Sequence, residues 1–151
     1  MALPTDGVRT FRAAPFAGDH RDGNAMQFIV SPDDARLGLP FSAAVRVGDV
    51  LYLSGAIGNR PGTLSLAEGG IAAETRQAME NIGRTLEACG LGFEDVFKCT
   101  IMLADMSDWR AFNDVYIAYF AKGRLPARSA FGASGLALGA RVEIECLARF
   151  A

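Results

Sequence analysis

Two charged residues in the last quarter of the chain are the best candidates for chemistry. Arg128 lies in "RLPARSAFG" (residues 124–132), a stretch too apolar for an ordinary solvated loop, and Glu143 lies early in "ARVEIECLARF" (residues 140–150). Arginine presents a rigid planar fork that matches a carboxylate. The two residues therefore predict either a site for a carboxylate ligand or an internal ion pair.

The spacing of these residues favours the structural interpretation. Both stretches are predicted strands, and if they pair, Arg128 and Glu143 come close. An internal ion pair between them would then form, or a cross-strand pair among the charged residues of the last strand, which are Arg141, Glu143, Glu145 and Arg149. Structural ion pairs are common, so spacing alone does not establish a function.

The sequence offers few residues for nucleophilic or metal-dependent catalysis. The only histidine, His20, lies in a segment rich in Gly and Asp, which disfavours a Ser-His-Asp or Cys-His nucleophilic site. No Cys or His residues have the spacing of metal ligands, so we expect no metal site. The three cysteines lie in apolar runs and predict reduced, buried thiols, hence a cytoplasmic protein: Cys89, Cys99 and Cys146.

Length and charge limit the class of protein. A chain of 151 residues suits one compact domain. A net charge of −2 with 21% charged residues disfavours a nucleic-acid partner and permits a small neutral or anionic metabolite. No run reaches about 18 apolar residues and the start has no long apolar core, so we expect neither a membrane partner nor export.

The elements that must position these residues follow from periodicity. Residues 1–25 are rich in Gly, Pro, Asp and Arg and predict an N-terminal extension, either a family-specific arm or an upstream reading with Met26 as the start; residues 26–151 form the domain. The predicted order is βββαβαββ, an α+β fold with a single sheet and two helices packed on one face. The strands are 26–30, 41–47, 50–57, 94–104, 126–133 and 140–150; the helices are 71–89 and one opening at Asp105.

Three details of these elements can be tested. Gly83 inside the first helix predicts a close neighbour at that point. An aromatic stripe in the second helix predicts core packing: Trp109, Phe112, Tyr116 and Phe120. The opposite face of the sheet is uncovered and partly apolar, which predicts oligomerisation.

Several motifs together resemble one known family. The segments "LPFSAAVRVGDVLYLSGAIG", "ETRQAMENIGRTLEACGLGFEDVFKCTIMLADMSDWRAFNDVYIAYF" and "PARSAFGASGLALGARVEIECLA" are similar to the RidA family, also called YjgF/YER057c/UK114 and endoribonuclease L-PSP, from Met26 to Ala148. The resemblance implies a chorismate-mutase-like subunit, a homotrimer with sites between subunits, and cofactor-free hydrolysis of enamines and imines such as 2-aminoacrylate and 2-iminopropionate to 2-keto acids and ammonia.

The resemblance also implies roles for single residues. Arg128 of "PARS" would hold the substrate carboxylate, and Glu143 of "VEIE" would orient the attacking water and handle protons. Ser54 of "LSG" and Asn113 of "FNDVY" match positions that line the family's site.

The chain departs from the family pattern in the pocket. Phe41 replaces a tyrosine, and Ala130 replaces a cysteine that many members carry two residues after the arginine. Ala43 and Ala56 stand where many members have glutamine. These differences predict a smaller-sided, more apolar pocket.

Three functions remain open at this stage. The first is an enamine/imine deaminase. The second is a non-catalytic, 2-keto-acid-binding or chaperone-like trimer, which the lost Tyr and Gln groups favour. The third, an endoribonuclease, is disfavoured by the net charge of −2 and the single histidine.

Overall fold

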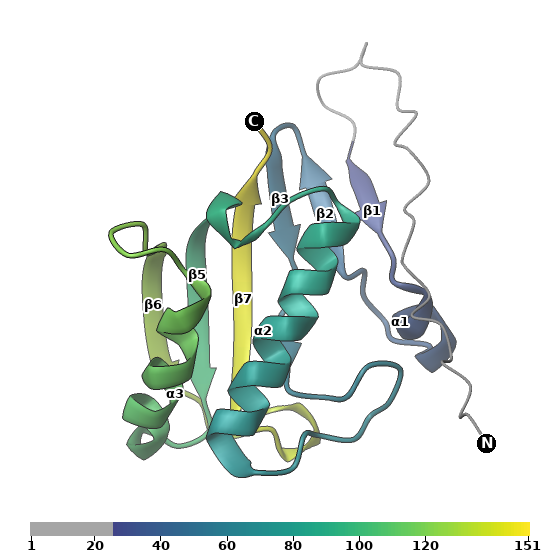
Figure 1. The fold of residues 1–151 in the computed structure, drawn as a ribbon. Helices are drawn as coiled ribbons and strands as arrows, with labels where there is room; N and C mark the ends of the chain where they lie inside the picture. Colours follow the sequence, from purple (N-terminus) through teal and green to yellow (C-terminus); the bar gives the residue numbers. More distant parts are fainter. Residues whose placement is uncertain (1–25) are drawn as a thin grey trace, which may run out of the picture.

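The computed structural model describes residues 26–151, and the predicted extension, with His20, lies outside the described residues. The fold is a seven-stranded mixed sheet in the order β1-β2-β3-β7-β5-β6, with β4 beside β7. The long helices α2 (Gly70–Ala88) and α3 (Trp109–Tyr116) lie side by side across one face (Figure 1). The predicted α+β fold, with a single sheet and two helices on one face, is confirmed.

The remaining strands, 3₁₀ turns and short helix have the following bounds. The strands are β1 (Gln27–Ile29), β2 (Ala44–Val47), β3 (Val50–Leu53), β4 (Ala56–Ile57), β5 (Val96–Leu103), β6 (Ala127–Gly132) and β7 (Val142–Arg149). Short 3₁₀ turns are Phe93–Asp95, Met106–Asp108, Ile117–Tyr119 and Ala137–Gly139. A short helix, α1 (Pro32–Leu37), was not predicted because six residues are too few to show helical periodicity.

The predicted strand 50–57 is interrupted. Its two parts, β3 and β4, both pair with β7, but three residues of one chain segment (53–55) lie opposite two of β7 (145–146). Such an extra residue bends the strand in the manner of a β-bulge. Gly55 is needed at this bend, because a Cβ there would overlap the carboxylate of Glu143.

Helix α2 forms as its apolar spacing predicts. Met79, Ile82 and Leu86 are at most 1% exposed and pack on the sheet. The chain leaves the helix at Gly90, whose φ of +74° suits a residue without a Cβ. A Cβ on Gly83 would lie 3.3 Å from Cε2 of Phe93, which confirms the close neighbour predicted there.

The second helix is preceded by a 3₁₀ turn that opens at the predicted Asp105, and the α-helix itself begins four residues later, at Trp109. Asp105 accepts a hydrogen bond from the backbone N–H of Ser107 and so caps a 3₁₀ turn that leads into α3. Phe112 and Tyr116 are buried, and Trp109 and Phe120 pack beside them, so the aromatic stripe is core packing as predicted.

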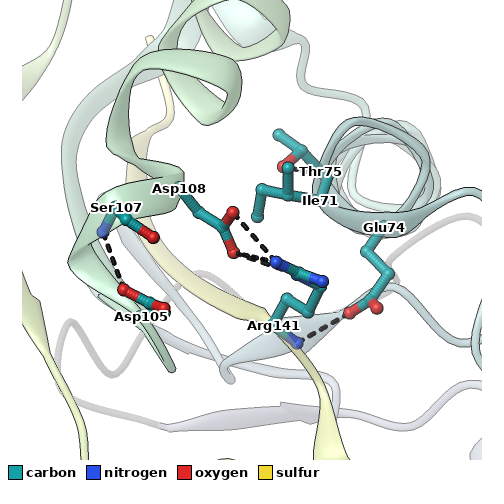
Figure 2. A network of polar contacts seen from close by, with 7 residues as sticks. All are labelled: Ile71, Glu74, Thr75, Asp105, Ser107, Asp108 and Arg141. Carbon is teal, nitrogen blue, oxygen red and sulfur yellow. Dashed lines mark hydrogen bonds and ion pairs between the residues drawn. The ribbon is translucent and has the colours of Figure 1, made fainter.

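A polar network ties both long helices to the start of β7. Figure 2 shows that the Glu74 carboxylate of α2 accepts the backbone N–H of Arg141 at 2.8 Å. The guanidinium of Arg141 donates to both oxygens of Asp108, at 2.9 and 3.0 Å. Arg141 therefore pairs with the turn before α3, and not with a neighbour in its own strand. The network fixes where β7, the strand that carries Glu143, begins.

Strand β7 is central and alternates as predicted. Four of its residues are fully buried under the helices: Val142, Ile144, Cys146 and Ala148. The alternate residues, Glu143, Glu145, Leu147 and Arg149, lie on the open face.

The premise that strands 126–133 and 140–150 pair is wrong. Strand β5 lies between them, antiparallel to β7 and parallel to β6. The cause is the crossover through α3, because a strand–helix–strand connection places the second strand parallel to the first in the sheet.

The open face of the sheet carries an apolar row. Successive cross-strand neighbours are Phe28, Val45, Tyr52 and Leu147, and Phe28 is 64% exposed. Both long helices lie on the other face (Figure 1). The expectation of an uncovered, partly apolar face is confirmed. None of the helices in residues 26–151 has the length and hydropathy required to cross a membrane.

Candidate functional site

Arg128 lies near the start of β6, the edge strand, on the face that the helices cover. Its cross-strand neighbour is Cys99, which is fully buried. Three rings of α3 surround the guanidinium: its Cζ is 5.1 Å from the ring centroid of Trp109, 5.8 Å from Phe112 and 5.0 Å from Tyr116. Such contacts with aromatic faces stabilise a cation that is only partly in water. The arginine is thus held half-buried at the rim of the core.

One side-chain hydrogen bond anchors this arginine. Nη1 of Arg128 donates to Oδ1 of Asn113, on α3, at 2.7 Å. Within residues 26–151 no carboxylate lies within ion-pair distance of Arg128. The guanidinium has five N–H donors, and the neutral Asn113 oxygen leaves its charge uncompensated. The predicted internal ion pair with Glu143 is therefore wrong, and the remaining donors suit the two oxygens of a carboxylate.

Glu143 lies on the open face of the sheet. It is level with Ile57 on one side and Met102 on the other, between the buried residues Val142 and Ile144. Arg128 and Glu143 consequently occupy opposite faces of one subunit, with β5 between their strands. The expectation that neighbouring strands bring the two side chains together is wrong within a single chain.

The remaining predicted site residues divide between these two places. Ala130 shares the face of Arg128 two residues further along β6, packed against the core, and Asn113 bonds Arg128 directly. We name this set, Arg128, Asn113 and Ala130, the arginine group. Ser54 lies at the bend beside Gly55, where its hydroxyl donates to the backbone oxygen of Ser42 at 2.6 Å.

Phe41 completes the second set. It directly precedes Ser42 and is 51% exposed, so its ring is available at the surface near the bend. We name Glu143, Ser54 and Phe41 the glutamate group. Of the six predicted residues, Arg128, Asn113 and Ala130 thus lie on the side that the helices cover, whereas Glu143 lies on the open face, and Ser54 and Phe41 lie near the bend at Gly55.

Sequence reasoning missed the dual role of the aromatic stripe. Trp109 and Tyr116 were assigned to the core, and they also form the wall against which Arg128 lies. The sequence contains an indication of this second role, because Asn113 is one helical turn from both Trp109 and Tyr116. Burial raises the pKa of Tyr116 far above its usual range, so its hydroxyl stays protonated and cannot serve as a base at neutral pH.

Two hollows in residues 26–151 lie away from both groups. An open groove of about 780 Å³ lies before β6 and is lined by residues including Phe97, Arg124 and Phe150, but not by Arg128 or Glu143. Among the described residues no three potential ligands cluster as a metal site would require. The chemistry that this arrangement offers is carboxylate binding at Arg128 and proton handling at Glu143.

The sheet order and the edge-strand arginine define a class of small α+β proteins with one mixed sheet and two long helices on one face. Residues 35–150 match the family model described as "Endoribonuclease L-PSP". The chain belongs to this family, the RidA or YjgF family.

Named relatives extend the match to most of the chain. A mouse (Mus musculus) protein named 2-iminobutanoate/2-iminopropanoate deaminase is 44% identical over 109 residues, which are 72% of this chain and 80% of that protein. The chloroplastic Reactive Intermediate Deaminase A of Arabidopsis thaliana is 35% identical over 148 residues, covering 94% of this chain and 79% of its own.

Solved structures agree on the fold. The crystal structure of YyfA, a member of the conserved Rid protein family from Yersinia pestis, superposes with a TM-score of 0.76 at 34% identity. The superposition covers 83% of this chain and all of that one.

Proposed function

We propose that this protein is a hydrolase of reactive 2-enamines and 2-imines, such as 2-aminoacrylate and 2-iminopropionate, which it converts to 2-keto acids and ammonia. The observation that carries the proposal is the state of Arg128: half-buried, anchored by the neutral Asn113 oxygen, and without a carboxylate partner among residues 26–151. The relatives named as deaminases support it.

The proposed chemistry needs binding, water and proton transfer. The enamine first tautomerises to the imine, and protonation of its nitrogen makes the carbon electrophilic. Water adds to that carbon, the C–N bond breaks, ammonia leaves, and the carbonyl of the 2-keto acid forms. Arg128 would hold the substrate carboxylate, while Glu143 would accept a proton from the water and return it to the departing nitrogen. No cofactor takes part.

We further propose a homotrimer with a site between subunits. The separation of the two groups supports it: a substrate that is held by Arg128 of one subunit can meet Glu143 only if another subunit supplies it. The apolar row on the open face, which ends at Leu147 on the same face of β7 as Glu143, supports the same assembly. The free, buried thiols support a cytoplasmic location.

The direct test is an enzyme-coupled assay. A serine dehydratase releases 2-aminoacrylate from serine, and semicarbazide traps the 2-iminopropionate that has not yet been hydrolysed. The wild type should raise the yield of pyruvate and lower that of the trapped adduct, whereas Arg128→Ala should not. Arg124→Ala, four residues earlier in the chain, is the matched control and should act as the wild type does. Identical traces for wild type, Arg128→Ala and buffer would reject the proposal for this substrate.

A non-catalytic, 2-keto-acid-binding trimer is the second candidate. The observation in its favour is that Phe41 has no hydroxyl and that the hydroxyl of Ser54 is already bonded to Ser42. It predicts saturable pyruvate binding that depends on Arg128, without turnover. The endoribonuclease hypothesis gains nothing from the site, because residues 26–151 contain no histidine and the whole chain has a net charge of −2.

A further inference from the structure

Two of the three cysteines meet in the core directly behind Arg128. Cys99 of β5 and Cys146 of β7 are cross-strand neighbours in antiparallel register. Their Sγ atoms are 3.2 Å apart although the residues are 47 positions apart in the sequence. Both thiols are free and fully buried. Cys89, the remaining cysteine, lies at the end of α2 and is also free.

The register of the two strands suits a disulfide. Directly opposed residues in an antiparallel pair have Cα atoms about 4.5 to 5.5 Å apart. Disulfides span Cα separations of roughly 4.4 to 6.8 Å, a range that includes this separation. Opposed Cβ atoms lie about 4.5 to 5.5 Å apart, a little beyond the usual disulfide range of about 3.5 to 4.5 Å. The strands would only have to draw slightly together.

The surroundings of the pair favour reaction at Cys99. The hydrogen bond between the two thiols lowers the pKa of Cys99, burial opposes this effect, and the nearby cations Arg128 and Lys98 lower the pKa further. The same bond, together with burial, raises the pKa of Cys146. The hydroxyl of Tyr116, which reaches the same region, is buried without a hydrogen-bond partner. Cys99 is therefore the thiol that more readily ionises.

Access to the pair is possible from the sheet edge. Among residues 26–151 a single strand, β6, lies outside β5, and Arg128 of β6 is the neighbour of Cys99 in the pairing of these strands. Arg128 is half-buried and retains one side-chain hydrogen bond, so its displacement opens a short route. A small uncharged oxidant can use such a route more readily than a bulky or charged one.

We propose that Cys99 and Cys146 form an oxidisable dithiol, a modification site at which hydrogen peroxide produces a buried disulfide. The sulfur of Cys99 attacks one oxygen of hydrogen peroxide while the thiol proton passes to the other oxygen; the O–O bond breaks, and one water and a Cys99 sulfenic acid result. The sulfur of Cys146 then attacks that of Cys99, the S–O bond breaks, and the second water leaves. Two thiols lose two electrons and two protons, and one hydrogen peroxide becomes two waters.

The test uses the intact protein in native buffer. Hydrogen peroxide is added and removed, and the chain is then denatured in the presence of N-ethylmaleimide and weighed by mass spectrometry. We expect a chain that has lost two hydrogen atoms, one alkylated residue at Cys89, a cross-linked Cys99–Cys146 peptide pair, and full reversal by dithiothreitol. Alkylation at all three cysteines, a disulfide that includes Cys89, or oxygen adducts on Cys99 without a cross-link would overturn the proposal.

Two variants sharpen the result. Cys89→Ser is the matched control and should form the same disulfide to the same extent. Cys146→Ala should form none and should instead gain oxygen at Cys99. Because Cys146 is fully buried, this variant can lose stability; the wild-type and Cys89→Ser measurements decide the question without it.

Discussion

The guanidinium of Arg128 donates to the amide oxygen of Asn113 at 2.7 Å, a bond that joins the edge strand β6 to helix α3. Asn113 thereby orients a cation that receives no compensating charge from residues 26–151. A neutral partner is the chemically suitable one for a binding arginine, because a carboxylate in the same place would occupy the guanidinium.

The fork of Arg128 should be essential for substrate binding. Arg128→Ala leaves the substrate carboxylate without its partner, a loss of roughly 2 to 5 kcal/mol by analogy with truncated charge pairs. We expect kcat/KM for 2-iminopropionate to fall by about 30-fold or more. Arg128→Lys should recover little, because an ammonium does not present two parallel donors. Steady-state rates for both variants beside Arg124→Ala measure the effect; a fully active Arg128→Lys would contradict it.

Asn113→Asp should convert the arginine site into an internal ion pair. The new carboxylate would lie at hydrogen-bond distance from Arg128 and compete with that of the substrate, so we expect KM to rise by about tenfold or more while the protein stays folded. Asn113→Ala removes the anchor without adding charge and should raise KM less. Separate determination of KM and kcat tests the order. A KM for Asn113→Asp at or below that of Asn113→Ala would exclude competition.

The fold could be predicted further than the site. The alternation of apolar residues in β7 and their three- and four-residue spacing in α2 reflect burial on one face. Each pattern can be recognised in its own stretch of sequence. Which strands become neighbours depends on the crossover through α3. Nothing in the sequence of residues 126–150 indicates that β5 lies between β6 and β7. The sequence therefore predicts that Arg128 and Glu143 lie close together, whereas they lie on opposite faces of the sheet. The contact of Cys99 with Cys146 was hidden for the same reason.

The open face of the sheet should be an interface between subunits. Leu147 lies at the end of the apolar row and next to Tyr52, so Leu147→Glu would place a charge in a surface that assembly buries. We expect this variant to sediment as a monomer where the wild type sediments as a trimer, and to lose deaminase activity with it. Leu64→Glu is the matched control, since Leu64 is 52% exposed in the loop before α2. A trimeric Leu147→Glu would show that this face is not the interface.

The carboxylate of Glu74 should contribute to stability through the backbone N–H of Arg141. Glu74→Ala leaves that donor without its partner where Glu74 is only 6% exposed, and a lost partner of this kind costs about 1 to 3 kcal/mol of unfolding free energy. Glu74→Gln keeps an acceptor oxygen at the same reach and should lose less. Urea unfolding of both variants at one protein concentration makes the comparison. Equal loss in the two variants would assign the effect to charge and not to the hydrogen bond.

Asp105 should make stability depend on pH in acid. The backbone N–H of Ser107 holds the pKa of this carboxyl below its ordinary value of 3.8, with a smaller contribution from the Ser107 side chain. A group whose pKa is lower in the folded state binds fewer protons there than when unfolded, so its stabilisation is complete above the unfolded pKa and disappears as the pH falls through the folded one.

The variant Asp105→Asn isolates this contribution, because an asparagine can cap the same turn without titrating. The wild type should be the more stable protein at pH 6. The difference in unfolding free energy should shrink as the pH drops below about 4. Denaturant titrations at several pH values test the sign, with Asp114→Asn, a change within α3 itself, as a control for the loss of one carboxylate. A difference that grows in acid would mean that the folded state binds the proton of Asp105 more tightly, which the cap geometry forbids.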